Sequence, residues 1–198
     1  MREYLDIIKT VLDKGVKKDP SDLQTTIGRC GVPTLSYFGY HYKIDLNNGF
    51  PLLTTKKMAF KSIIHELLWF LSGETHIRNL MVVTHIWDDW TSAEKNWELG
   101  NTYGYQWTRW EQYLKNDETG RLEMRHINQL QEVIERLKND PYSRRMVVSA
   151  WNPADFNRPA DDPKRTVQPS ACHTMFMFWV GPDKRLNCHL TQRSGDVM

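Results

Sequence analysis

The sequence predicts an α+β fold, and two observations lead to that prediction. Segments with helical periodicity and segments rich in β-branched and aromatic residues follow one another without regular strand–helix–strand alternation. Two apolar runs, at 174–180 and 186–190, are separated by a Gly-Pro-Asp-Lys turn at 181–184, which predicts an antiparallel hairpin. No internal repeat or low-complexity segment is found, so we interpret residues 1–198 as a single domain.

Helices are expected where apolar residues recur every three or four positions. They cover residues 2–14, 60–71, 127–138 and a short stretch from Thr75 toward Val83. The 60–71 segment is apolar nearly all round, which predicts a buried helix. Gly15 and Gly73 stand where the first two helices are expected to end, and an Asn-Asp-Pro sequence follows the 127–138 segment.

Strands are expected where aromatic and β-branched residues gather between turn signals. They cover residues 34–46, 146–151, 174–180 and 186–190. The polar stretch 116–124 predicts a loop. Residues 152–170 hold four prolines and many charges, which predicts a long surface loop.

Composition narrows the class of protein. The chain is 40% hydrophobic and 25% charged, which is ordinary for a globular protein, and its net charge of +2 gives no general case for nucleic-acid binding. Three scattered cysteines without a CxxC spacing argue against a disulfide framework and a structural zinc site. The amphipathic, charged N-terminal segment lacks a signal peptide's apolar core, and no stretch is long enough to span a membrane, so we expect a cytoplasmic protein that needs no metal.

Cys172 is the strongest candidate nucleophile. It precedes His173, and the predicted hairpin brings residues 192–196 (Gln-Arg-Ser-Gly-Asp) to the same end of a sheet. Nearby positive charge lowers the pKa of a thiol and raises the fraction present as thiolate. The alternative for a lone cysteine is an inert buried residue. We interpret Cys188 as a packing residue and Cys30 as a weaker rival.

Four arginines stand near expected strand ends or turns: Arg29, Arg144, Arg145 and Arg193. The planar guanidinium matches the geometry of a phosphate, so together they favour a phosphate clamp, although surface charge is the usual fate of any single arginine. No P-loop sequence is present.

Several other side chains could handle protons or stack on a ring. Glu66 lies inside an apolar helix, where burial raises a carboxyl pKa; it is either a general acid/base or a satisfied structural carboxylate. Tyr103 could position a proton or a water, and Asp196 could accept a hydrogen bond from a ring N–H. Five tryptophans form either core or a wall against which a planar ring stacks: Trp87, Trp90, Trp97, Trp107 and Trp110.

These features occur together in segments that resemble the thymidylate synthase family. The segments, in the family's order, are GFPLLTTKK (49–57), IIHELLWFLSGET (63–75), HIWDDW (85–90), YGYQW (103–107), YSRRMVVSAWNP (142–153) and QRSGDV (192–197). Several are long and specific, which makes coincidence a poor explanation.

The resemblance implies both a fold and a reaction. The fold would be a large mixed, mostly antiparallel twisted sheet flanked by helices. The reaction would be the reductive methylation of dUMP to dTMP with 5,10-methylenetetrahydrofolate, through a covalent adduct of Cys172 with carbon 6 of the pyrimidine. The catalytic residues implied are Cys172, Glu66, Tyr103 and Asp196.

The resemblance also implies binding residues and a partner. The residues for dUMP would be Arg29, Arg144, Arg145, His173, Gln192, Arg193, Ser194, Gly195 and Asp196. The residues for folate would be Lys56, Ile86, Trp87 and Asp196. Arg144 and Arg145 would reach the phosphate of the neighbouring subunit, which implies a homodimer.

The family continues beyond the position of Met198 with nucleotide-recognition residues and a tail that closes over folate. We therefore expect a chain that is truncated at its C-terminus and, by itself, an incomplete enzyme. Three alternatives stay open: a pyrimidine nucleotide hydroxymethylase, a non-catalytic protein on the same fold, and general RNA or DNA binding. Survival of the catalytic set and the balanced charge argue against the last two.

Overall fold

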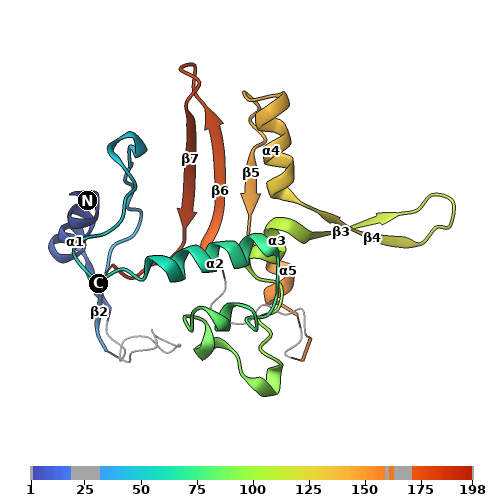
Figure 1. The fold of residues 1–198 in the computed structure, drawn as a ribbon, viewed down its shortest axis with the longest axis horizontal. Helices are drawn as coiled ribbons and strands as arrows, with labels where there is room; N and C mark the ends of the chain where they lie inside the picture. The colour runs from blue at the N-terminus through green and yellow to red at the C-terminus, as the bar shows by residue number, and fades with distance from the viewer. Residues whose placement is uncertain (1, 19–31, 159–160, 163–170, 198) are drawn as a thin grey trace. The chain divides into compact units, whose positions relative to one another are not determined.

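The computed structural model describes residues 2–18, 32–158, 161–162 and 171–197. Its helices and antiparallel strands confirm the α+β class (Figure 1). The chain forms two compact units, one of residues 1–58 together with 196–198 and the other of residues 59–195. None of the helices in the described ranges is both long and apolar enough to cross a membrane.

The first unit contains one amphipathic helix and one short hairpin. Helix α1 (Arg2–Lys14) confirms the prediction for 2–14, and it is followed by β1 (Val16–Lys18), which pairs antiparallel with β2 (Thr34–Ser36). The strand predicted for 34–46 is therefore too long. Gly39 has a φ of 79°, which is incompatible with an extended strand, and η2 (Leu46–Asn48) is a single 3-10 turn.

The second unit is built around the close crossing of two helices, α2 (Phe60–Ser72) and α3 (Tyr103–Arg109). Gly73 ends α2 in the left-handed conformation, as predicted. A Cβ on Gly104 would lie 2.1 Å from the carbonyl oxygen of Phe70, so only glycine allows this approach.

The prediction that α2 is buried all round is wrong for the described chain. Only Trp69 and Phe70 are buried, whereas six apolar side chains are 39–56% exposed: Phe60, Ile63, Ile64, Leu67, Leu68 and Leu71. The reason is that, within the second unit, α2 packs mainly against α3 and the 3-10 turn η3 (Leu80–Val82), which cover one side of it.

The helix expected from Thr75 toward Val83 is also absent, apart from η3. The backbone near Thr75 is instead extended: its carbonyl accepts a hydrogen bond from Leu99 N (2.8 Å), and His76 forms a bridge with Glu98. Two further 3-10 turns, η4 (Asp88–Trp90) and η5 (Ala93–Lys95), complete this connection.

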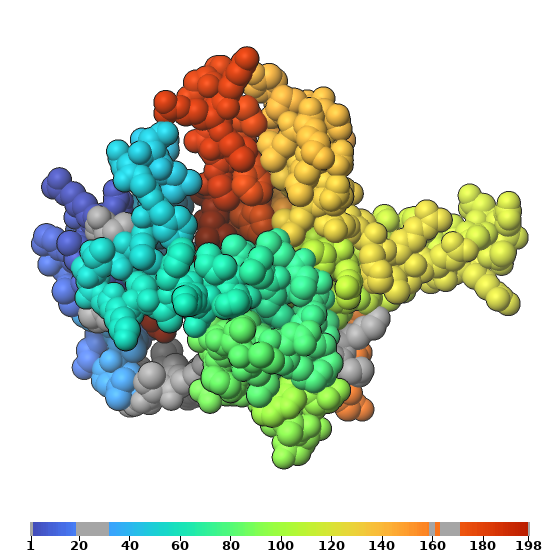
Figure 2. All heavy atoms as spheres, in the orientation of Figure 1, coloured from blue at the N-terminus to red at the C-terminus, as the bar shows by residue number. Residues whose placement is uncertain are grey.

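The loop predicted for 116–124 is confirmed for residues 116–121, which form the turn of a hairpin, and is wrong for residues 122–124, which belong to a strand. Strands β3 (Trp110–Lys115) and β4 (Leu122–Ile127) pair antiparallel and project from the rest of the second unit (Figures 1 and 2). Asn116 accounts for the tight turn, because its side-chain oxygen accepts from the backbone N–H groups of Glu118 and Thr119. Helix α4 (Gln129–Asn139) follows, close to the predicted bounds.

The sheet that carries the site has three strands in the order β5-β6-β7, all antiparallel. They are β5 (Val147–Ser149), β6 (His173–Val180) and β7 (Leu186–Gln192), so the predicted hairpin is confirmed. The short helix α5 (Pro153–Phe156) lies within the stretch predicted as loop, where Asn152 caps it and proline occupies its first turn. Cys188 is exposed on β7, so its interpretation as a packing residue is wrong; it lies in the outer strand of the described three-stranded sheet.

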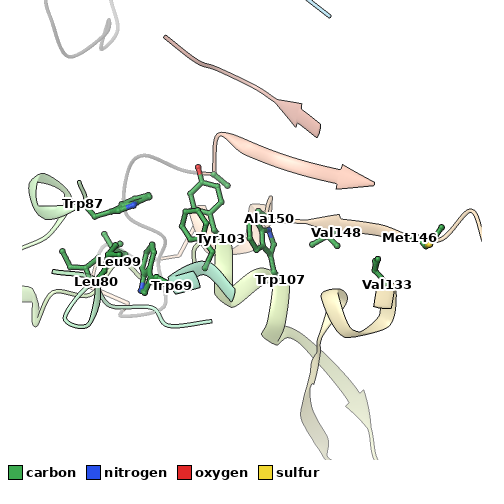
Figure 3. Close-up of a cluster of buried hydrophobic side chains, with 13 residues drawn as sticks. Trp69, Leu80, Trp87, Leu99, Tyr103, Trp107, Val133, Met146, Val148 and Ala150 are labelled. Carbon is green, nitrogen blue, oxygen red and sulfur yellow. The ribbon is translucent and has the colours of Figure 1, made fainter. Parts of the chain in front are cut away.

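A core rich in aromatic rings joins these elements (Figure 3). The ring of Phe70 lies 4.7 Å from that of Tyr103 and 5.5 Å from that of Trp107. Trp87 and Trp107 belong to the buried cluster, and Trp90 and Trp97 are partly buried and pack against that cluster. The tryptophan segment is thus mainly core, and it fixes Tyr103 beside the start of β6.

Candidate active site

Cys172 immediately precedes β6 and is half-buried. Its backbone N–H donates to the hydroxyl of Tyr103 at 2.6 Å, and its carbonyl accepts from Arg193 N at 2.9 Å. These two contacts fix the main chain on both sides of the thiol. The sulfur itself is therefore presented by a backbone that α3 and the end of β7 hold in place.

Arg193 brings a positive charge to this sulfur. Its Nη2 lies 3.7 Å from Cys172 Sγ, and its Nε donates to the carbonyl of Ala171 at 3.1 Å. The hairpin register, with His173 opposite Gln192, creates this proximity, as the sequence predicted. The site therefore has a positively charged group in contact with the candidate nucleophile.

Glu66 is linked to the same region through the core. Its Oε1 accepts from the indole N–H of Trp87 at 2.7 Å. Burial raises the pKa of Glu66, and the hydrogen bond from Trp87 opposes that rise in part. The predicted rise in the carboxyl pKa is thus confirmed in direction, and the hydrogen bond from Trp87 orients the carboxyl group.

Tyr103 connects this carboxylate region to the thiol. Its ring lies 6.2 Å from that of Trp87 and 5.8 Å from that of His173. Burial is the main reason that the pKa of Tyr103 is raised to about 12, so the phenol is neutral near pH 7. Burial also lowers the pKa of His173, which favours the neutral imidazole.

The remaining predicted residues lie in several places. Gln192, Ser194 and Gly195 are exposed beside Arg193, where the Gln192 amide donates to the Ser194 carbonyl at 2.8 Å. Arg144 and Arg145 are exposed on the connection between α4 and β5, and neither forms an ion pair within the ranges that the structure describes.

The predicted folate residues are divided between the two units. Ile86 is exposed and Trp87 is 8% exposed, both in the second unit. Lys56 and Asp196 are exposed residues of the first unit. Arg29 and Cys30 lie outside the described residues. In the described ranges, no group of histidine, cysteine, aspartate and glutamate side chains is arranged to hold a metal ion.

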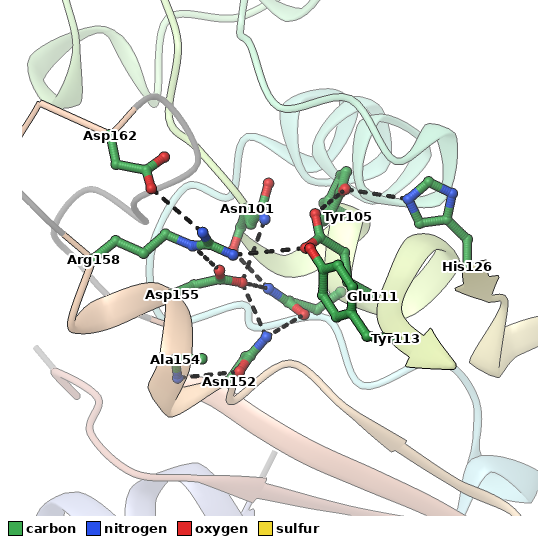
Figure 4. A network of polar contacts seen from close by, with 11 residues as sticks. Asn101, Tyr105, Glu111, Tyr113, His126, Asn152, Ala154, Asp155, Arg158 and Asp162 are labelled. Atoms are coloured by element: carbon green, nitrogen blue, oxygen red, sulfur yellow. Dashed lines mark hydrogen bonds and ion pairs between the residues drawn. The ribbon is translucent and has the colours of Figure 1, made fainter. Parts of the chain in front are cut away.

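A buried polar cluster was missed from the sequence (Figure 4). Asp155 of α5 is 1% exposed and accepts from Gln106 Nε2 at 2.5 Å, from Asn152 Nδ2 at 3.0 Å and from Arg158 Nε at 2.5 Å. Gln106 belongs to α3, so the cluster joins α5 to the helix that carries Tyr103. The Asn-Pro sequence at 152–153 is the signal that could have predicted α5.

The fold and the site together define an enzyme-like α+β protein with a half-buried thiol, a guanidinium against its sulfur, and a carboxyl of raised pKa linked through the core. A model of the thymidylate synthase family matches residues 2–198, so the chain belongs to the thymidylate synthase family. Membership supports a methyltransferase-type enzyme of dTMP synthesis; the family generally uses methylenetetrahydrofolate and is generally dimeric.

Proposed function

We propose that this chain converts dUMP to dTMP, with 5,10-methylenetetrahydrofolate as co-substrate and dihydrofolate as the second product. One observation gives the proposal its main support: the sulfur of Cys172 lies 3.7 Å from the Arg193 guanidinium at the start of a strand whose backbone Tyr103 and Arg193 fix. A preorganised thiolate is what covalent activation of a pyrimidine requires.

In the proposed reaction the Cys172 thiolate attacks carbon 6 of the uracil ring. A sulfur–carbon bond forms, and the electron pair of the 5,6 double bond moves toward carbon 5 and the ring carbonyl. Carbon 5 then becomes a nucleophile. It would form a bond to the one-carbon unit of the co-substrate. Removal of the carbon-5 proton would then break the bond between that carbon and the folate nitrogen and leave an exocyclic methylene on the ring. Addition of a hydride to this methylene would give the methyl group as the Cys172 sulfur departs with its electron pair, which restores the ring double bond and the thiolate, so the enzyme is unchanged by a full turnover.

Glu66 and Tyr103 are the proposed proton-handling residues. Because burial raises the pKa of Glu66, its protonated form is more accessible near neutral pH than that of an exposed glutamate, which suits proton exchange with a ring carbonyl through water. Tyr103 is neutral near pH 7, so we propose that it assists removal of the carbon-5 proton by hydrogen bonding to the water that takes it. The neutral His173 lies beside the proposed pyrimidine position.

Methylenetetrahydrofolate supplies a one-carbon unit and then a hydride in this chemistry. The proposed folate residues are Lys56, Ile86, Trp87 and Asp196. Exposed Ile86 beside the mostly buried Trp87 offers apolar surface of the kind on which a planar ring packs, and Asp196 can accept from a pterin N–H. Taken one by one, these side chains have the chemistry that binding of a folate requires.

Arginines would hold the dUMP phosphate. We propose Arg193 and Ser194 from the same chain with Arg29, and Arg144 and Arg145 from a second copy, which would make the active unit a homodimer. The exposure of Arg144 and Arg145 supports this assignment. We further propose that Gln192 and Gly195 line the dUMP site and that the enzyme works in the cytoplasm, as three scattered cysteines suggest.

The test is the intact mass of the protein after incubation with 5-fluoro-dUMP and methylenetetrahydrofolate. Fluorine at carbon 5 cannot leave as a proton, so the proposed reaction stops with both ligands attached to the enzyme. We expect this mass increase in the unsubstituted chain and in the Cys188→Ala control, and no increase in Cys172→Ala. An adduct that persists in Cys172→Ala would refute the assignment of the nucleophile.

Product analysis with dUMP separates the remaining reactions. Release of dTMP agrees with the proposal, whereas release of a 5-hydroxymethyl nucleotide would replace it with hydroxymethylation, in which water ends the reaction in place of hydride.

A further inference from the structure

Arg193 contacts an aromatic ring that no part of the proposed reaction uses. Its Cζ lies 5.5 Å from the centroid of the Trp151 ring, within the range of a cation–π interaction. Trp151 follows β5 directly, and its side chain is 37% exposed. The ring is itself held in place, because the ring of Phe156 in α5 lies 4.5 Å away at an angle of 56°.

The Arg193 guanidinium contacts both the strand side of the site and the Trp151 ring, and these contacts orient it. On the strand side, Nε donates to the carbonyl of Ala171, the residue before the thiol. The Trp151 ring provides a second contact, and Nη2 lies near Cys172 Sγ. Arg193 is an exposed residue with a long, flexible side chain, so each contact near its end narrows the range of orientations that the guanidinium can adopt.

We propose that Trp151 is a positioning residue that holds the Arg193 guanidinium against the sulfur of Cys172. The inference rests on the proposed function only in taking Cys172 as the nucleophile. Trp151 would act through Arg193: removing the ring lets the guanidinium turn away, and the thiolate at Cys172 loses a favourable charge. A cation–π contact at an exposed site corresponds to about a two- to fivefold effect.

The electron-rich face of the Trp151 ring attracts the Arg193 cation. A side chain of similar shape that lacks such a face would therefore not replace it. An aliphatic side chain of similar size would still cover Phe156 but would not attract a cation. Phenylalanine keeps a weaker ring face. We therefore expect the Arg193 guanidinium to be held most strongly in the unsubstituted protein, less strongly in Trp151→Phe and least in Trp151→Leu.

The experiment measures the alkylation rate of Cys172 by iodoacetamide from about pH 6 to about pH 10, with the labelled peptide quantified by mass spectrometry. We expect Trp151→Leu to lower the rate near pH 7 by about two- to fivefold and to leave the high-pH plateau unchanged. The plateau reports access to the thiol, so a steric effect would lower it instead. The alkylation rate of Trp151→Phe near pH 7 should lie between those of the unsubstituted protein and Trp151→Leu.

Two matched variants make the result decisive. Trp179→Leu removes a tryptophan of the same sheet that is 54% exposed, and we expect it to leave the profile unchanged. In an Arg193→Gln background, Trp151→Leu should have no further effect, because the group through which it acts is gone. An unchanged profile in both Trp151 variants, or an equal loss in the Arg193→Gln background, would overturn the proposal.

The alkylation assay needs neither dUMP nor folate. If the fluorinated nucleotide forms no adduct while the alkylation pattern is as expected, the proposed function fails and the positioning role of Trp151 stands. If Trp151→Leu does not fold, the Trp151→Phe variant and its Arg193→Gln double variant still decide the question.

Discussion

Replacing Gly104 with alanine tests whether the crossing of α2 and α3 is as close as the structure indicates. A Cβ at this position would lie 2.1 Å from the carbonyl oxygen of Phe70 and 2.8 Å from its carbonyl carbon. Ordinary contacts of a Cβ begin near 3.4 Å, so the backbones would have to separate by about 1 Å. The obstacle is backbone, which cannot move aside as a side chain can.

Two effects of this substitution have opposite signs. Helix propensity alone predicts that alanine stabilises a helix over glycine by about 0.5–1 kcal/mol. Forcing extra volume into a well-packed contact costs about 1–3 kcal/mol, and a rigid obstacle favours the upper part of that range. We therefore expect Gly104→Ala to lower the free energy of unfolding by about 1–2 kcal/mol.

The assay is urea unfolding followed by tryptophan fluorescence. All eight tryptophans lie within residues 59–195, so the signal reports on the second unit. Gly181→Ala is the matched control, because the one close contact of its Cβ would be with the side-chain oxygen of Asp183, which can move away, and its contacts with the Trp179 ring, at 3.4 and 3.5 Å, are of ordinary length. A Gly104→Ala variant as stable as the unsubstituted protein, or more stable, would refute the close crossing.

Two further substitutions test the buried polar groups. Burial raises the pKa of Glu66 in the folded state above its ordinary value, so its favourable contribution is complete below the unfolded pKa of about 4.3 and is lost as pH rises through the folded pKa. Glu66→Gln, which keeps an acceptor for Trp87, should therefore gain stability relative to the unsubstituted protein as pH rises from about 4 toward neutral; a difference that does not change with pH would contradict this. Asp155→Asn should lower the free energy of unfolding by about 3 kcal/mol, because it breaks a buried pair with Arg158, while Asp161→Asn, at an exposed position, should change it little. Equal stability of the two aspartate variants in urea unfolding would show that the cluster is dispensable.

Much of the local structure could be predicted because it depends on local chemistry. The ends of α1 and α2 follow from glycines at 15 and 73, and the β6–β7 hairpin follows from a four-residue turn between apolar runs. The closeness of Arg193 to Cys172 could be predicted for the same reason, since a short hairpin brings its two outer ends together.

The errors arise where a contact between distant segments decides the conformation. The stretch after Thr75 is predicted as helix, but Thr75 and His76 pair with residues 98–99, and only turns and η3 follow them. Asp155 reads as part of a charged surface loop, yet Gln106 and Arg158 compensate its burial. No local pattern indicates either partner, because each depends on how α3 and α5 pack.

The same distinction explains how the candidate nucleophile is held. The sequence identifies Cys172 and Arg193, which lie at adjoining strand ends, and it also identifies Tyr103 as a candidate. It does not indicate the contacts that Tyr103 and Trp151 make with these strand ends, because they come from α3 and from the end of β5. The sheet topology therefore brings Cys172 and Arg193 together. Other elements then hold them: α3 fixes the backbone of Cys172, and the end of β5 contacts the guanidinium of Arg193. Substitutions at these outer supports should change how reactive Cys172 is without removing any group that reacts, and so the alkylation profile in the absence of substrate distinguishes their role from that of the nucleophile itself.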